Sequence, residues 1–352
     1  MKHRIAIAGR PIGLDSPPFI IAEMSGNHNH SLDRALALVD AAADAGAHAL
    51  KLQTYTADTM TLPIRTSAFV IDDPNSLWHG RSLHDLYEEA HTPWDWHGPI
   101  FERARSLGMI PFSTPFDDTA VDFLESLDVA CYKIASFEMT DIHLVRRVAR
   151  TGKPMIISTG MGTVAEIAET VAVARDAGAT DLILLKCTSA YPSMPEDANI
   201  LTIPNLRETF QCEAGLSDHT MGVGVSVASV AHGATVIEKH FTLRRADGGV
   251  DSAFSLEPEE MRALVVETQR AWASLGGVSY GASSAQETKS LAFRRSLYVS
   301  EDMAAGEIFT AANVRAIRPG YGLPTKYLDT VLGRKAARAI KRGEPVGWDM
   351  LG

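Results

Sequence analysis

The sequence predicts an α/β protein, a (β/α)8 TIM barrel followed by a small C-terminal domain. Between residue 19 and about residue 275, eight apolar segments rich in β-branched residues alternate with helix-compatible segments, and this alternation is typical of parallel barrels. Polar or charged residues end these segments, and barrel active sites are built at the carboxyl ends of strands. The chain has 352 residues, so a barrel of about 250 residues leaves room for one further module.

The composition excludes several classes of function. With 33 Lys and Arg against 43 Asp and Glu, the formal net charge is −10, and without a basic run we expect no nucleic-acid partner. The N-terminal segment lacks the apolar core of a signal peptide, and no segment has the length of a membrane span, so we expect a cytoplasmic protein without a membrane partner. Cys131, Cys187 and Cys212 are widely spaced and odd in number, which favours buried, reduced thiols.

The N-terminal part supplies a hairpin, a strand and a helix. Residues 3–10 alternate in polarity and lead into a turn rich in Gly and Pro, which suits a short hairpin that closes the base of the barrel. The apolar run 19–23 is the first barrel strand and ends on Glu23. A helix over 32–47 follows, with Ser31 as its N-cap. A charged residue at the end of a buried strand makes Glu23 a candidate site residue.

The second strand, residues 48–55, is followed by a long insertion. Lys51 and Gln53 occupy alternate positions of this strand, so we expect both side chains to point into one cavity. The insertion, residues 56–92, contains two prolines, several aromatic residues and charges of both signs. Because a loop of this length inside a compact domain usually has a role, we expect it to form a lid or a wall of the substrate pocket.

The next four strands bring hydroxyl groups and a second lysine to the same end of the barrel. These strands are predicted at 109–117, 131–138, 153–162 and 181–192. Their candidate side chains are Thr114, Lys133, Ser136, Ser158, Ser189 and Tyr191. Two buried ammonium groups, Lys51 and Lys133, are costly without an anion, and with the hydroxyls, including Ser217 of the following strand, they suit phosphate and carboxylate. The alternative is that each hydroxyl only caps a helix.

The last two strands carry two histidines. His219 ends the strand predicted at 214–219 and His240 lies near the end of the strand at 235–242, 240 − 219 = 21 residues further on, which suits one βαβ step. Acidic residues of the same stretch are Asp218, Glu238 and Asp251. Two imidazoles beside carboxylates can hold a divalent metal with open positions. The alternative is that each histidine only makes a hydrogen bond at its strand end.

The remaining helices and the C-terminal domain follow from the same pattern. Further helices are predicted at 93–108, 118–129, 141–152, 221–234 and 257–276. They complete a barrel domain over 1–275, and a Gly- and Ser-rich linker, 276–290, joins it to a domain at 291–352. Short strands broken by Gly and Pro, without a long helix, predict a compact, loop-rich unit of roughly 60 residues. The loop of this domain best suited to binding a ligand is RPGYGLP, in which rigid turn residues follow Arg318.

Eight short motifs occur in an order that matches a known family. They are FIIAE, KLQT, FSTPFD, YKIAS, ISTGM, GLSDH, EKHFT and RPGYG. Over essentially its whole length the chain resembles the sialic acid synthase family. The resemblance implies a barrel with a C-terminal antifreeze-like (SAF) domain and a homodimer in which that domain covers the active site of the other chain. It also implies the condensation of phosphoenolpyruvate with an amino-sugar aldehyde.

The resemblance also assigns roles to individual residues. His219 and His240 would hold a divalent cation, Mn²⁺, Mg²⁺ or Co²⁺, that binds the aldehyde oxygen of the sugar, and Glu23 would steady a cationic C2 or activate water. C3 of phosphoenolpyruvate attacks the aldehyde, water adds at C2, and phosphate leaves by C–O cleavage. Phosphoenolpyruvate would contact Lys51, Thr114, Lys133, Ser136, Ser158 and Ser217. The sugar would contact Gln53, Ser189, Tyr191 and Asp251, with Arg318 reaching its N-acyl group from the other chain.

Other functions remain open from the sequence. N-acetylneuraminate synthases of the family carry an Asn where this chain has Ser189, which argues against N-acetylmannosamine as the substrate. A Schiff-base aldolase would use a barrel lysine, Lys133 or Lys186, as its nucleophile. A non-catalytic interpretation takes the C-terminal domain as a carbohydrate- or ice-binding module on an inactive barrel, and the complete set of polar strand ends argues against it.

Overall fold

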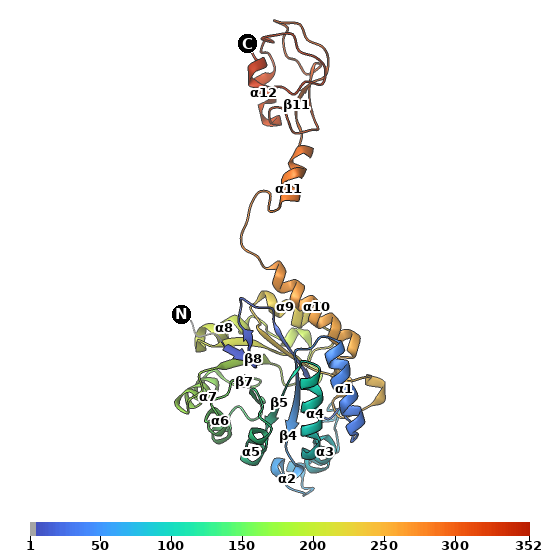
Figure 1. The fold of residues 1–352 in the computed structure, drawn as a ribbon, viewed down its shortest axis with the longest axis vertical. Helices are drawn as coiled ribbons and strands as arrows, with labels where there is room; N and C mark the ends of the chain where they lie inside the picture. The colour runs from blue at the N-terminus through green and yellow to red at the C-terminus, as the bar shows by residue number, and fades with distance from the viewer. Residues whose placement is uncertain (1–4) are drawn as a thin grey trace. The chain divides into compact units, whose positions relative to one another are not determined.

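Residues 5–352 are described by the computed structural model, in which the chain forms two compact units (Figure 1). The first unit extends to Leu275 and the second covers Gly276–Gly352. The division falls where the sequence places the start of the Gly- and Ser-rich linker. Among residues 5–352, no helix has both the length and the apolar character needed to cross a lipid bilayer.

The first unit is a closed barrel of eight parallel strands in chain order, completed by pairing of the last strand, β10, with the first, β3. The strands are β3 (Phe19–Glu23), β4 (Ala49–Thr54), β5 (Ile110–Pro115), β6 (Tyr132–Ile134), β7 (Met155–Ser158), β8 (Leu182–Cys187), β9 (Glu213–Ser217) and β10 (Val236–His240). Each lies where the sequence predicts a strand, although β9 begins one residue earlier. All five residues of β3 are buried, because helices cover the outside of a parallel barrel.

In the described part of the chain, eight helices surround the barrel (Figure 1). They are α1 (Leu32–Asp44), α4 (Trp94–Ser106), α5 (Asp118–Ser126), α6 (Ile142–Ala149), α7 (Val164–Asp176), α8 (Thr202–Phe210), α9 (Gly224–Ala231) and α10 (Pro258–Ser274). The predicted cap of α1 is confirmed, since the Ser31 hydroxyl accepts a hydrogen bond from Arg34 N. Thr163 and Glu166 form a capping box at the start of α7. Such caps fix where each helix leaves the loop that follows a strand.

Shorter elements lie in the loops. They are α2 (Ala57–Met60), the 3-10 turn η1 (Ser67–Phe69) and α3 (Leu83–Ala90) in the insertion, then η2 (Pro195–Asp197), η3 (Arg245–Asp247) and η4 (Ser252–Phe254). The insertion turns back on itself through a bridge between Val70 and Ser82. Indole Nε1 of Trp78 donates a hydrogen bond to Val250 O, 3.0 Å away. The insertion therefore reaches the loop after β10, as expected of a wall beside the strand ends.

A two-stranded hairpin closes the base of the barrel. Strands β1 (Ile5–Ile7) and β2 (Arg10–Ile12) are antiparallel, with Ile5 opposite Ile12. Ile5, Ile7 and Ile12 are buried in the same apolar core as the barrel strands. This agrees with the hairpin predicted at the start of the chain, of which residues 3 and 4 lie outside the described residues.

The second unit has its own small core. Its strands β11 (Ser296–Val299) and β12 (Val314–Ile317) are antiparallel, and a cluster that includes Leu297, Phe309 and Val331 is buried around them. The remaining elements are α11 (Ala285–Ser290), η5 (Leu291–Phe293), η6 (Thr325–Tyr327), α12 (Leu328–Val331) and η7 (Trp348–Met350). Helix α11 lies within the predicted linker; its N-cap, the Ser284 hydroxyl, accepts from Glu287 N. That part of the linker is therefore helical rather than irregular.

Candidate active site

Two lysines and two glutamates form a buried cluster at the carboxyl ends of the strands. Lys51 Nζ lies 2.5 Å from Glu23 Oε2 and 3.8 Å from Glu238 Oε1. Lys133 Nζ lies 3.2 Å from the same Glu238 oxygen. All four side chains are at most 5% exposed. The predicted interior positions of Lys51 and Lys133 are thus confirmed, and the cluster is close to electrically neutral without a ligand.

The pKa values of the cluster are displaced in opposite directions. Burial raises the pKa of Glu23 despite the neighbouring Lys51, whereas burial of Glu238 is outweighed by Lys133 and Lys51, which lower its pKa. Burial lowers the pKa of Lys133, while the two glutamates outweigh burial and raise that of Lys51. Carboxyl groups with separated pKa values are suited to different roles, so Glu23 can exchange a proton while Glu238 stays ionised.

The four predicted hydroxyl groups lie at or just after the carboxyl ends of barrel strands, and one of them contacts a lysine. Thr114 Oγ1 accepts a hydrogen bond from Lys51 Nζ at 3.2 Å, and Ser217 Oγ donates to Glu238 Oε1 at 3.2 Å. Ser136 Oγ accepts from Gly160 N at 3.1 Å, and the buried Ser158 Oγ has no hydrogen-bond partner among residues 5–352. None of these hydroxyls caps a helix of the described chain. The capping alternative is therefore wrong for them.

Gly160 allows the β7 loop to approach this cluster. A Cβ at this position would lie 2.2 Å from Ser189 Oγ and 2.7 Å from Ser136 Oγ. Any larger residue would push the two hydroxyls apart, so glycine is required by close approach rather than by backbone conformation.

The two predicted histidines face each other. Their ring centroids are 5.4 Å apart, and both residues are buried. His219 Nδ1 donates to Thr188 O at 2.9 Å, so the neutral form of this ring has its acceptor on Nε2. His240 Nδ1 is buried without a hydrogen-bond partner in the described chain and lies 3.8 Å from Asp251 Oδ2. The alternative that each histidine only makes a hydrogen bond at its strand end does not describe His240.

The protonation of these rings depends on their neighbours. Burial, together with the charge of His219, lowers the pKa of His240 well below its usual value, so its ring is neutral and can act as a ligand. Although burial alone would lower the pKa of His219, its contact with Cys187 raises it. Cys187 Sγ lies 4.0 Å from His219 Nδ1, and this contact outweighs burial to lower the thiol pKa to about 6.

The donor set fits a divalent cation only in part. Two imidazoles face each other and one of their nitrogens is an orphaned buried polar atom, which suits a metal ion. Among residues 5–352, however, no group of three or more His, Cys, Asp and Glu side chains is arranged to hold a metal ion. A cation bound between His219 and His240 would therefore take its remaining ligands from water or substrate.

A chain of polar side chains leads away from the cluster toward Asp251. Gln53 Nε2 donates to Glu23 Oε1 at 3.1 Å and to Ser25 Oγ at 3.2 Å. The Ser25 hydroxyl in turn donates to Asp251, whose pKa is raised by burial. Ser25 was not predicted as a site residue, although it stands two positions after Glu23 in a polar turn, which was an available signal.

Aromatic rings line the same side of the site. The Tyr191 ring lies 4.5 Å from the His219 ring and 5.9 Å from the Trp78 ring, measured between centroids. Phe254 packs 4.9 Å from the His240 ring. Ser189 Oγ lies 3.7 Å from Cys187 Sγ, in the loop between β8 and Tyr191. Insertion residue Trp78 was not predicted individually, because nothing in its local sequence shows which loop it contacts.

One candidate of the barrel, Lys186, is held outside the cluster. Lys186 Nζ donates to Cys187 O at 2.9 Å and to Thr188 Oγ1 at 3.0 Å, so its ammonium is bound within its own loop. Arg318 belongs to the second unit. Glu238, which received no separate role from the sequence, is the residue that connects the two lysines. Asp218, expected beside the histidines, pairs instead with Lys239.

A second buried ion pair fixes the loop that carries His219. Lys239 Nζ lies 3.0 Å from Asp218 Oδ2 and donates to Thr220 O and Gly222 O. Asp218 also accepts from Ser226 Oγ at 2.6 Å. In β10, Lys239 lies between the site residues Glu238 and His240. Because successive side chains of a strand point to opposite faces, the Lys239 side chain points to the outer face. Its ion pair supports the histidine from outside the barrel.

Fold and site together define a TIM-barrel enzyme with a buried cluster of charged side chains at its strand ends. The chain belongs to the NeuB family, which it matches over residues 38–280, and residues 294–352 match the SAF domain. These matches confirm the predicted family, the (β/α)8 barrel and the C-terminal SAF domain.

Individual relatives are similar over nearly the whole chain. A pseudaminic acid synthase of Campylobacter jejuni is 44% identical over 330 residues, covering 94% of this chain and 95% of that protein. An N,N'-diacetyllegionaminic acid synthase of the same species is 32% identical, covering 92% of this chain and 97% of that protein. The crystal structure of an N-acetylneuraminic acid synthetase from Leptospira borgpetersenii, in complex with citrate, matches with a TM-score of 0.72 and 32% identity, covering 82% of this chain and 95% of that one.

Proposed function

We propose that this chain is a pseudaminic acid synthase, a transferase that condenses phosphoenolpyruvate with 2,4-diacetamido-2,4,6-trideoxy-L-altrose to give pseudaminic acid and phosphate. The observation that carries the proposal is the buried cluster of Lys51, Lys133, Glu23 and Glu238 beside two facing histidines. Similarity supports the choice of sugar, since identity is 44% to a pseudaminic acid synthase and 32% to a diacetyllegionaminic acid synthase.

Phosphoenolpyruvate brings a phosphate and a carboxylate to the two lysines. Its anionic oxygens would take the place of the glutamate oxygens now facing Lys51 and Lys133, and hydroxyls can donate to the remaining lone pairs. The hydroxyls within this part of the site are Thr114, Ser136, Ser158 and Ser217. Ser158 Oγ is buried without a partner among the described residues, so an anion would supply the hydrogen-bond acceptor that it lacks.

Glu23 is the group placed to move a proton. Because burial raises its pKa, Glu23 can take up the proton that is lost when water adds at C2 of phosphoenolpyruvate. C3 forms the new bond to the aldehyde carbon, and the aldehyde oxygen takes up a proton to become a hydroxyl. After water has added at C2, the bond between C2 and the phosphate oxygen breaks, phosphate leaves with that oxygen, and the oxygen from water becomes the keto oxygen. Gln53, which donates to Glu23 at 3.1 Å, orients the carboxyl for this role.

We also propose that His219 and His240 hold a divalent cation, Mn²⁺, Mg²⁺ or Co²⁺. Such an ion would supply Lewis-acid polarisation of the sugar aldehyde. His219 is held by Thr188 O, and the uncharged ring of His240 keeps its lone pair for a cation. The Asp251 carboxylate, held through Ser25 and Gln53, then accepts hydrogen bonds from hydroxyl or amide groups of the sugar.

Sugar selectivity would come from the loops beyond the cluster. Tyr191, Trp78 and Phe254 form an aromatic side of the pocket, against which a 6-methyl group can pack. An apolar contact of this size discriminates by only about 1–3 kcal/mol, whereas polar groups that pair with an N-acyl substituent discriminate more strongly. Selectivity should therefore depend on the 4-acetamido group more than on the 6-position, with Ser189 among the residues that contact the sugar.

A homodimer would complete the site. Exposed apolar residues follow four successive strands at the mouth of the barrel: Phe137, Met161, Met194 and Met221 are 50–63% exposed. Such a ring of apolar side chains indicates a surface that a partner covers. We propose that the SAF domain of a second chain covers it and that Arg318 of the partner subunit contacts the N-acyl group of the sugar. The three free cysteines suit a cytoplasmic location.

Turnover of a panel of sugars tests the proposed reaction. Purified protein with phosphoenolpyruvate and Mn²⁺ should release phosphate fastest with 2,4-diacetamido-2,4,6-trideoxy-L-altrose, more slowly with stereoisomeric diacetamido sugars and least with N-acetylmannosamine. Mass spectrometry should find the condensed nine-carbon acid. Faster turnover of N-acetylmannosamine would contradict the choice of sugar. If borohydride with pyruvate labels Lys133 covalently, the enzyme is instead a Schiff-base aldolase.

A further inference from the structure

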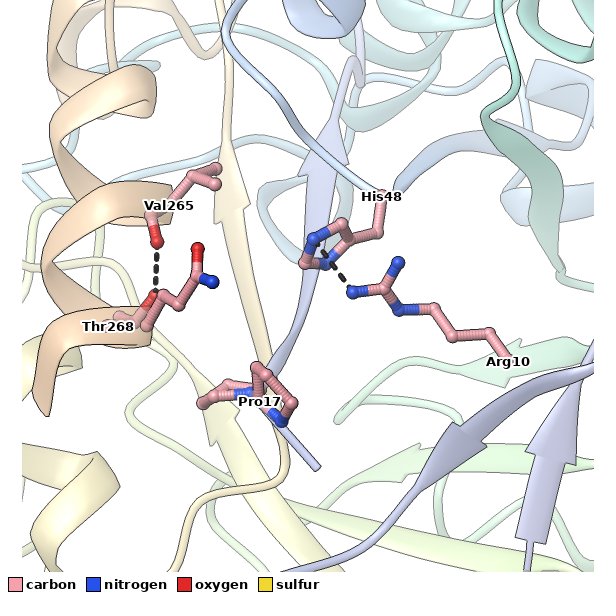
Figure 2. A pocket seen from close by; sticks show the side chains of 7 residues that line it. Arg10, Pro17, His48, Val265 and Thr268 are labelled. Carbon is pink, nitrogen blue, oxygen red and sulfur yellow. Dashed lines mark hydrogen bonds between the residues drawn. The ribbon is translucent and has the colours of Figure 1, made fainter. Parts of the chain in front are cut away.

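A pocket lies beside the hairpin, at the end of the barrel where the strands begin. Figure 2 shows the residues that line it. Its polar lining residues are Arg10, His48, Thr268 and Gln269, and two prolines and Val265 complete it. Arg10 belongs to the hairpin at the base, His48 directly precedes β4, and Thr268 and Gln269 lie on α10. No carboxylate of the described chain lines this pocket, although it contains a cation.

Arg10 lacks a carboxylate partner in the described chain. No ion pair joins its guanidinium to an acidic side chain within residues 5–352, whereas Arg34 and Arg207 are paired with Asp247 and Glu213 at 2.9 and 3.0 Å. The guanidinium carbon of Arg10 lies 5.9 Å from the Phe19 ring centroid, which gives a weak cation–π contact. Its Nη2 lies 2.9 Å from His48 Nε2 (Figure 2).

The contact between Arg10 and His48 sets one hydrogen-bond donor against another. Ile20 N donates to His48 Nδ1 at 2.9 Å, so a neutral ring carries its proton on Nε2. That N–H then faces the guanidinium, which has donors only. If the proton is on Nδ1 instead, the Nδ1–H faces the N–H of Ile20, and two donors again face each other. Burial, with the charge of Arg10, lowers the His48 pKa to about 4, which keeps the ring neutral and the conflict in place.

We propose that this pocket binds a small oxyanion, a carboxylate or a phosphate, between Arg10 and His48. The two nitrogens are now 2.9 Å apart, so they must separate to admit an anionic oxygen. That oxygen then accepts from the guanidinium and from Nε2–H, so both donors gain a partner and the cation gains a counter-charge. The side chain of Gln269 is exposed, and its amide stands at the pocket wall as a further donor. The proposal does not depend on the reaction catalysed at the other end of the barrel.

Phosphate should also bind the lysine cluster, so the experiment must separate two sites. Histidine labelled with ¹³C at Cε1 gives one signal per ring, and loss of a signal in His48→Gln identifies that of His48. Phosphate is titrated into the Lys133→Ala variant, which weakens the active site, and into the same variant carrying Arg10→Gln. A parallel titration uses acetate, which separates carboxylate from phosphate. Arg146→Gln, an arginine outside the pocket, is the matched control.

We expect saturable movement of the His48 signal with a dissociation constant of about 1 mM, from two charge-assisted hydrogen bonds. Arg10→Gln should weaken binding about tenfold or more, because it removes the charged donor, and Arg146→Gln should leave it unchanged. Bound anion should also raise the His48 pKa. A His48 signal that neither phosphate nor acetate moves, or that moves equally in Arg10→Gln, would overturn the proposal.

Discussion

Single charges at the strand ends define the chemistry of this protein. Lys51 and Lys133 are each held against a glutamate, so neither ammonium is buried without a counter-charge. An incoming anion must compete with these carboxylates.

Removing either lysine should weaken phosphoenolpyruvate binding in particular. Lys51→Ala and Lys133→Ala each remove a charge-assisted hydrogen bond of about 1.5–3 kcal/mol, so KM for phosphoenolpyruvate should rise about 10- to 150-fold. The KM for the sugar should change far less. Lys153→Ala, which breaks the ion pair with Glu125 outside the site, is the control. Unchanged KM for phosphoenolpyruvate in both variants would place the anion elsewhere.

Metal dependence should follow the two histidines. We expect EDTA to abolish activity and Mn²⁺ to restore it, because facing imidazoles are the ligands available for a cation. His219→Ala or His240→Ala should prevent this recovery. Calorimetric titration of Mn²⁺ should show binding to the native chain and loss of binding in either variant. Full turnover in metal-free buffer would exclude the assignment.

Glu138 should make folding stability depend on pH. Burial, only partly offset by its own backbone N–H, raises the pKa of this carboxyl from 4.5 to about 7, and its Oε2 has no hydrogen-bond partner within residues 5–352. Between these two values the folded chain binds more protons than the unfolded chain, so the contribution of Glu138 to stability falls as pH rises. Glu138→Gln should be nearly neutral at pH near 4.5 and stabilising by about 3 kcal/mol above pH 7.

Urea unfolding of both proteins at several pH values measures this difference. Glu125→Gln, which changes a carboxyl on α5, controls for the loss of one negative charge. A constant difference between Glu138→Gln and the native chain across this pH window would show that the Glu138 carboxyl is not displaced.

At the scale of elements, the site depends on how loops are tied to strands. The loop after β9 carries His219, and Lys239 ties that loop to β10 through Asp218, Thr220 and Gly222. Loops usually carry the functional residues while strands and helices hold them in place. Here a buried ammonium on the outer face of one strand positions an imidazole beyond the end of the next.

Breaking this ion pair should cost more stability than breaking an exposed one. Lys239→Met leaves Asp218 buried and ionised, and we expect a loss of about 3 kcal/mol or more. Lys341→Met, which breaks an exposed pair with Asp302, should cost less than about 1 kcal/mol. Urea unfolding compares the two. Mn²⁺ affinity should fall in Lys239→Met but not in Lys341→Met, which distinguishes positioning of His219 from a general loss of stability.

For the whole molecule, the question is which chain supplies Arg318. We propose that it completes the pocket of the partner subunit, so active sites contain residues from two chains. Inactive His240→Ala and inactive Arg318→Ala chains should regain activity when they are co-expressed. One of the two pockets of each heterodimer then carries neither lesion. A statistical mixture should reach about a quarter of native activity, since half of the dimers are heterodimers with one intact pocket.

Phosphate release by tagged, purified heterodimers measures this recovery. The control is a mixture of His240→Ala with His219→Ala, in which both lesions lie in the barrel and every pocket carries one of them. No recovery in purified His240→Ala/Arg318→Ala heterodimers would show that each chain uses its own Arg318.

The sequence by itself determined the strands, most barrel helices and the residues at the strand ends. Alternation of apolar and polar residues is a local signal, so the pattern alone places Glu23, Lys51, Lys133, His219 and His240 at one end of a barrel. Family motifs added their roles. Local patterns also identified the cap at Ser31 and the hairpin at the base, because both depend on neighbouring residues in the chain.

Only the tertiary structure decided which of these residues meet. Barrel closure brings Lys133 to Glu238, 105 residues away, and Ser25 to Asp251, 226 residues away. It also sets Arg10 against His48 at the other end and places Lys239 on the outer face of its strand. Such contacts depend on strand stagger and loop packing, which no local period encodes. The alternation of apolar and polar residues predicts which face of a strand a side chain lies on. Closure of the whole barrel decides which other side chain it contacts.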